Sequence, residues 1–84
     1  MTKSQIKKIV ADLPERQRLP LLLKVEDLVE LLQVDKSTIS RHLKNGGELA
    51  ILPKFDVSPE GSKKRHWRFY RDSVLAFVIE KSLD

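Results

Sequence analysis

The 84-residue sequence contains no cysteine, which excludes disulfide bonds, thiol catalysis and cysteine-ligated zinc sites. Histidine is almost as scarce: His42 and His66 are the only two, so a metal site is not expected. The longest apolar run, residues 19–23, is far shorter than the roughly 20 residues that a membrane span needs. The N-terminus leads into a charged amphipathic stretch without the apolar region of a signal peptide. These absences predict a cytoplasmic protein with no membrane segment, metal or cofactor.

Catalytic patterns are also missing. Glu26 and Glu30 lie four residues apart on an expected helix, but neither has a His or Cys nearby in the sequence. The chain has no glycine-rich phosphate loop and no nucleophile beside a base. We therefore expect a single non-enzymatic domain spanning residues 1–84, with the thin core typical of a chain of this size.

Positive charge is concentrated in the middle of the chain. Residues 1–35 carry six basic and six acidic side chains, and residues 72–84 carry one basic and three acidic ones. Residues 36–71 carry three acidic side chains and nine basic ones, namely Lys36, Arg41, Lys44, Lys54, Lys63, Lys64, Arg65, Arg68 and Arg71. A basic segment of this kind is typical of a surface that binds a polyanion.

Residues 25–45 have the pattern of a helix-turn-helix. Asp35 is a suitable N-cap for the second helix, and the sequence Asn-Gly-Gly at 45–47 is suited to ending it. Gln33 stands where this pattern usually has glycine, and a left-handed glutamine there costs about 1 kcal/mol. The apolar positions that would fix the angle between the two helices are Val29, Leu32, Val34, Ile39 and Leu43. The alternative is an ordinary helical hairpin that only packs a core.

The flanking segments predict a mainly α fold with a small β-hairpin, that is, a winged helix-turn-helix with an extra N-terminal helix. The extra helix is expected over residues 4–13, capped by Ser4 and followed by a loop at 15–20. The hairpin, or wing, is expected over residues 49–70, with residues 49–52 and 55–57 forming an outgoing strand broken at Pro53. A last helix over 72–82 is expected to be capped by Asp72 or Ser73, with Leu83 facing inward.

Two groups of residues are candidates for DNA contact. On the second helix of the pair, the recognition helix, subtracting the core positions leaves Lys36, Ser37, Ser40, Arg41 and Lys44. An arginine can pair with guanine through two hydrogen bonds, whereas serine and lysine reach base edges or phosphates. On the wing, the basic residues Lys63, Lys64, Arg65 and Arg68, followed by Arg71, are expected at phosphates or in a minor groove. The alternative for each residue is a solvated surface position.

Two aromatic residues and His42 have simpler expected roles. Strand alternation places Trp67 and Phe69 on one face, where they are expected to pack the core and not to stack on bases. We expect His42 to be a packing residue or a phosphate donor, not a metal ligand.

Residues 22–78 resemble the MerR-like winged helix-turn-helix domains of small excisionases and AlpA-type regulators. The resemblance rests on LLKVEDLVELLQVDKSTISRHLKNGGEL, a hairpin, and then HWRFYRDSVLAF. It implies that Lys36, Ser37, Ser40 and Arg41 occupy recognition-helix contact positions and that Lys63, Lys64 and Arg65 lie at the wing tip. The chain departs from the family in its longer, proline-broken wing and its extra N-terminal helix.

The resulting hypothesis is a sequence-specific double-stranded DNA-binding protein that acts as an excisionase or as a small transcriptional regulator. The resemblance implies a site-specific recombinase or RNA polymerase as a further partner. The two departures from the family, the longer wing and the extra N-terminal helix, could serve a homodimer or cooperative assembly on DNA. Two alternatives remain open: a non-specific architectural protein that binds DNA through charge alone, and a protein-interaction adaptor with a vestigial helix-turn-helix.

Overall fold

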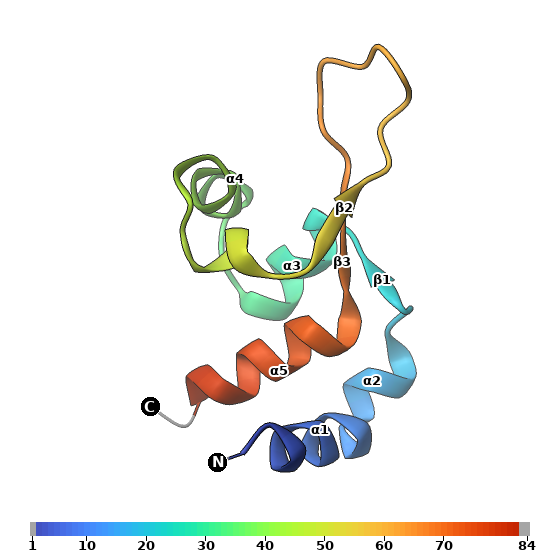
Figure 1. Cartoon of the computed structure of the whole chain (residues 1–84), viewed down its shortest axis with the longest axis vertical. Coiled ribbons are helices and arrows are strands. Elements are labelled where there is room, and N and C mark those ends of the chain that lie inside the picture. The colour runs from blue at the N-terminus through green and yellow to red at the C-terminus, as the bar shows by residue number, and fades with distance from the viewer. Residues whose placement is uncertain (1, 83–84) are drawn as a thin grey trace.

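The computed structural model describes residues 2–82, which form five α-helices, one 3₁₀ helix and three short strands. In chain order these are α1 (Lys3–Asp12), α2 (Pro14–Arg18), β1 (Leu22–Leu23), α3 (Val25–Leu32), α4 (Lys36–Asn45), η1 (Glu48–Ile51), β2 (Lys54–Asp56), β3 (Trp67–Tyr70) and α5 (Arg71–Ser82). Figure 1 shows α1, α2 and α5 gathered at the lower end, with α4 and the long loop between β2 and β3 in the upper half. The predicted winged helix-turn-helix class is confirmed.

The helix-turn-helix consists of α3 and α4, joined by a tight turn. Gln33 ends α3 in the left-handed region, at φ 56° and ψ 46°, as the sequence pattern requires. At the start of α3, the Asp27 carboxylate accepts a hydrogen bond from the Lys24 backbone N–H at 2.9 Å. Asp35 occupies the N-cap position of α4, but its side chain makes no capping hydrogen bond. Gly46 ends α4 at φ 73°, a conformation that glycine adopts without steric cost.

The sheet has three antiparallel strands in the order β1-β3-β2, one more than the predicted hairpin. The additional strand, β1, pairs Leu22 with Tyr70 and Leu23 with Phe69. The backbone N–H of Arg71 extends this contact by donating to the Leu21 carbonyl at 2.8 Å. The sheet therefore ties the segment before α3 to the strand that leads into α5.

The prediction of a strand at residues 49–52 is wrong, because this segment is the 3₁₀ helix η1. Its turns are closed by hydrogen bonds from Ala50 N–H to the Gly47 carbonyl and from Leu52 N–H to the Leu49 carbonyl. Leu49 is buried against the core, and Pro53 has no N–H to donate to a sheet ladder. The outgoing strand is therefore only β2, which begins after Pro53.

Two predictions for the N-terminal region are wrong. Thr2, not Ser4, caps α1: Thr2 Oγ1 accepts from Gln5 N–H, and Gln5 Oε1 accepts from Thr2 N–H. The expected loop at 15–20 is instead mostly the short helix α2, because Pro14 stands at its first position with a backbone angle already suited to a helix.

The cap predicted for the last helix is also wrong, since α5 begins at Arg71 and places Asp72 inside its first turn. The Asp72 carboxylate pairs with Arg71 and Arg16 instead of capping the helix. Leu83, which was expected to face inward, lies outside the described residues.

Two small hydrophobic clusters hold these elements together. The main cluster joins the sheet to the helix-turn-helix and to α5, and its buried residues are Leu23, Leu28, Ile39, Leu49, Phe69 and Val74. The second cluster packs Ile6 and Val10 of α1 against Leu75 of α5. The buried Phe69 and the half-buried Trp67 both pack in the main cluster. The exposed rings of Phe55 and Tyr70 contact each other in a tilted arrangement, with their centroids 5.8 Å apart.

Candidate nucleic-acid interface

The exposed surface of α4 is polar and basic. Burying Ile39, and partly burying Leu43, turns the opposite face of the helix to solvent. All five residues predicted for the recognition helix are exposed there, namely Lys36, Ser37, Ser40, Arg41 and Lys44. The amphipathic pattern of α4 thus presents one continuous face that could enter a DNA groove.

Lys36 and Arg41 on this face have different neighbours. Lys36 Nζ lies 3.8 Å from the Glu26 carboxylate on α3, and both side chains are about two-thirds exposed. Such an exposed ion pair contributes little to stability, and a phosphate could replace the glutamate. The Arg41 guanidinium extends along α4 to Thr38, where Nη2 donates to Oγ1 at 3.5 Å. This weak contact holds the guanidinium close to the helix surface.

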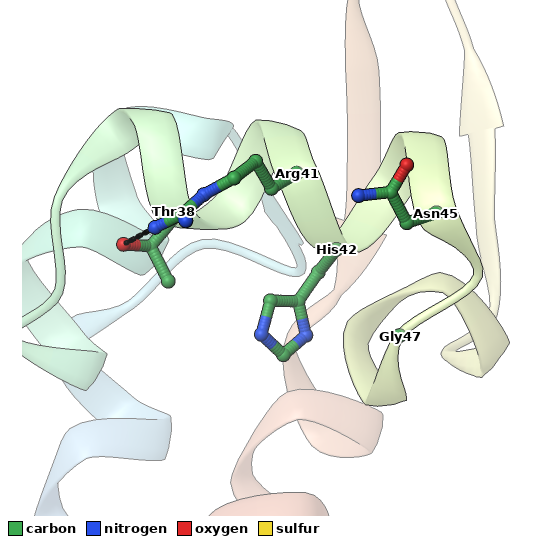
Figure 2. Close-up of a pocket in the computed structure, with 5 residues that line it drawn as sticks. All are labelled: Thr38, Arg41, His42, Asn45 and Gly47. Atoms are coloured by element: carbon green, nitrogen blue, oxygen red, sulfur yellow. Dashed lines mark hydrogen bonds between the residues drawn. The ribbon is translucent and has the colours of Figure 1, made fainter.

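A shallow depression opens on the flank of α4 (Figure 2). It is lined by Thr38, Arg41, His42, Asn45 and Gly47. The His42 ring packs so closely on Gly47 that a methyl group added at Gly47 would come within 2.6 Å of His42 Nδ1. Nδ1 is buried and has no hydrogen-bond partner among the described residues. Gly47 is therefore needed here for its small size, because its φ of −69° suits any residue.

The loop between β2 and β3, here called the wing loop (residues 57–66), is closed at its base by Asp56. One carboxylate oxygen, Oδ1, accepts from the backbone N–H groups of Ser58 and His66, each at 2.9 Å. Val57 N–H also donates to the His66 carbonyl at 2.9 Å. The hydrogen bonds from Ser58 and His66, with a smaller effect from Arg65, hold the pKa of Asp56 below its ordinary value.

The tip of the wing loop carries exposed positive charge. Ser62 N–H donates to the Pro59 carbonyl across a turn in which Gly61 adopts φ 85°. Lys63, Lys64 and Arg65 follow this turn and are exposed. Figure 1 shows the loop projecting away from the helices, so the exposed Lys63 and Lys64 are displayed on a projecting segment.

Cationic side chains surround Trp67 at the base of the wing. Lys54 Nζ and the Arg65 guanidinium lie 5.5 and 5.6 Å from the centre of the Trp67 ring. Lys54 Nζ also donates to the Ala50 carbonyl, which links β2 to η1. Arg68 is half-buried and donates to the Trp67 carbonyl at 3.1 Å. The guanidinium of Arg65 and the side chain of Arg68 therefore lie at the base of the wing, whereas Lys63 and Lys64 are exposed farther out on the loop.

Arg71, which the sequence grouped with the wing charges, is engaged inside the fold. Its guanidinium donates to the carbonyls of Arg16 and Leu19 at 3.1 and 3.2 Å and to Asp72 at 2.9 Å. Burial raises the pKa of Asp72, but hydrogen bonds and charge from Arg71 and Arg16 outweigh it and leave this pKa below its ordinary value. Arg71 therefore joins α5 to α2 and to the segment that follows α2, and it lies outside the basic surface of the wing.

Thr38 and Asn45 also belong to the α4 surface, although neither was predicted as a contact residue. Both line the depression beside Arg41, and Asn45 is exposed at the end of the helix. Their polar character was visible in the sequence, but the depression itself depends on how η1 folds back against α4.

Residues 2–82 contain no group of three or more His, Asp or Glu side chains arranged to hold a metal ion. None of the described helices is long and apolar enough to cross a membrane.

The comparison with known families agrees with this arrangement. The family model described as "Helix-turn-helix domain" matches residues 22–82, from β1 through α5, and leaves α1 and α2 outside the match. No curated protein and no solved structure gives a significant match. The match covers most of the chain and includes the helix pair, the wing and the last helix. The chain therefore belongs to the helix-turn-helix domain family and is a DNA-binding helix-turn-helix protein.

Proposed function

We propose that the protein binds double-stranded DNA at specific sequences, with α4 in the major groove and the wing loop on phosphates or in the adjacent minor groove. The observation that carries this proposal is the exposed polar and basic face of α4, in the same half of the molecule as the basic wing loop. An α-helix fits the major groove, where arginine and serine can form hydrogen bonds with base edges. Lysine and arginine on a projecting loop supply the sequence-independent attraction to phosphates.

The residues proposed to contact DNA fall into two roles. Arg41 is the candidate for pairing with guanine, because its contact with Thr38 is long and easily exchanged. Lys36, Ser37, Ser40 and Lys44 are proposed to flank it on bases or phosphates. Lys63, Lys64, Arg65 and Arg68 are proposed to hold the wing on the backbone of the DNA.

We further propose that the protein acts by occupying or bending its site, as an excisionase or a small transcriptional regulator. Its proposed partners are a site-specific recombinase in the first case and RNA polymerase in the second. Bending of circularly permuted fragments that carry the site would support the architectural role. An unbent site overlapping a promoter would support the regulatory role.

The first experiment is selection of bound duplexes from a random DNA pool at near-physiological salt. An enriched motif supports base recognition, and repeats within the motif indicate a dimer or cooperative assembly. Binding without enrichment that disappears on adding salt would contradict sequence specificity and favour an architectural protein.

A matched pair of variants then tests the role of α4. Arg41→Ala should weaken binding to the selected site by about 1–3 kcal/mol and reduce discrimination against scrambled DNA. Arg18→Ala is the control, since Arg18 is an exposed arginine on α2 outside the proposed interface. Equal losses of DNA affinity in the two variants would contradict base contact by Arg41. If Arg41→Ala leaves binding to a protein partner unchanged, the adaptor alternative is favoured.

A further inference from the structure

We propose that the depression on the flank of α4 holds one phosphate of the DNA backbone, bound by His42 and Asn45 together with Thr38. This inference rests on the proposed DNA binding and adds to it a separate contact site beside the base-contacting residues. Nothing in the sequence pattern marks Thr38 or Asn45 for this role.

The lining of the depression suits an anion. Thr38 supplies a hydroxyl, Asn45 an amide NH₂ group and His42 an imidazole, and the Arg41 guanidinium lies along the rim. Figure 2 shows the amide nitrogen of Asn45 turned toward the hollow. None of these lining residues is acidic, and all four polar side chains can donate hydrogen bonds to a phosphate oxygen.

The His42 ring is held in one orientation for this contact. Its Nδ1 edge is buried against Gly47, so that Nε2 is the ring nitrogen on the open side (Figure 2). A hydrogen on Nε2 can be donated to a ligand on this side.

The nearby carboxylate of Glu48 is directed elsewhere. Glu48 Oε1 accepts from Lys81 Nζ at 2.6 Å, which links η1 to α5. The side of η1 next to the depression therefore does not bring a competing negative charge into it. An arriving phosphate would meet the donors of α4 without displacing an ion pair.

The test combines Asn45→Ala with DNA in which single phosphates are replaced by neutral methylphosphonates along the selected site. Asn45 is exposed at the end of α4, and alanine favours helix, so the variant should fold. The variant should lose about tenfold in affinity for both preferred and scrambled duplexes, because a phosphate contact carries no sequence information. At one position along the site, replacing the phosphate by a methylphosphonate should weaken binding of the wild type but change the affinity of Asn45→Ala little further. This non-additivity would identify the phosphate that the depression holds.

Gly47→Ala provides a second variant that changes no contacting side chain. Its added methyl group should push the His42 ring out of place and lower the affinity for DNA. The methylphosphonate that weakens binding of the wild type should then weaken binding of this variant little further. Gln17→Ala on α2 is the control, because Gln17 is exposed and lies outside the depression. Thermal unfolding of each variant separates loss of the contact from loss of the fold.

The outcomes separate this inference from the proposed function. If the wild type binds a selected motif but every methylphosphonate affects the wild type and Asn45→Ala equally, the phosphate site is wrong and DNA binding stands. A third outcome is that inorganic phosphate alone shifts the NMR signals of His42 and Asn45 to saturation, while Asn45→Ala and the methylphosphonates act additively. In that case the ligand is a free phosphate and the assignment to DNA is wrong. If the wild type binds no DNA, the proposed function itself fails.

Discussion

Replacing Gln33 with glycine is expected to stabilise the protein. Gln33 is the only non-glycine residue with a positive φ in residues 2–82, and its side chain is exposed. A left-handed conformation costs an ordinary residue about 1–2 kcal/mol, whereas the extra freedom of glycine in the unfolded chain costs about 0.4–1 kcal/mol. The difference predicts a gain of about 0.5–1 kcal/mol in the free energy of unfolding, or about 5 °C in Tm for a domain of this size.

Urea denaturation followed by Trp67 fluorescence would measure this gain, because Trp67 is the single tryptophan and is half-buried in the main cluster. The matched control is Gln17→Gly, at an exposed helical position in α2, which should lower stability by up to about 1 kcal/mol. A midpoint for Gln33→Gly that equals or falls below that of the wild type would refute the reasoning. The affinity for DNA should stay the same, since Gln33 lies outside the proposed contacts.

Three further predictions concern the core, the wing and pH. Ile6→Ala should lower the free energy of unfolding by about 2–5 kcal/mol in urea titrations and leave the selected DNA motif unchanged, since Ile6 is buried between α1 and α5; an altered motif would contradict this. Asp56→Asn should speed hydrogen exchange at the His66 amide, because a neutral amide oxygen accepts more weakly than a carboxylate; unchanged exchange would exclude Asp56 as the closing group. Asp56 and Asp72 have lowered pKa values in the fold, so they stabilise the folded state at pH values above their ordinary pKa of 3.8. This stabilisation is lost as the pH falls through their pKa values in the folded state. Thermal unfolding at a series of pH values should show a smaller fall in Tm with acid for Asp72→Asn than for the wild type.

The helix-turn-helix could be predicted from the sequence because its determinants are local. The turn at Gln33, the stop at Gly46 and the apolar spacing of Ile39 and Leu43 all lie within one short segment. Strand β1 could not be predicted in this way, since Leu22 and Leu23 become a strand only by pairing with the distant Tyr70 and Phe69. The segment 49–52 has the composition of a strand, and its 3₁₀ form depends on burying Leu49 in the main cluster.

The candidate site also contains features that depend on local sequence and features that depend on distant contacts. The exposed charges of α4 and of the wing tip could be located by subtracting core positions from the sequence. The internal role of Arg71 could not, because the carbonyls that it contacts belong to Arg16 and Leu19, far away along the chain. The depression beside Arg41 was likewise hidden, since it depends on the contact between His42 and Gly47.

The main cluster fixes the distance between the two proposed DNA-contacting elements. Ile39 of α4 and Phe69 of β3 are both fully buried in it, so the recognition helix and the wing are anchored to the same few side chains. The N-terminal helix packs through the second cluster on α5, and Leu19 and Leu31 contact both clusters. The helices α1 and α2 lie outside the matched family region, and they pack on α5 on the side away from α4 and the wing (Figure 1). Because Leu19 and Leu31 belong to both clusters, the packing of the N-terminal helices on α5 also supports the cluster that sets the spacing of the proposed DNA-contacting elements.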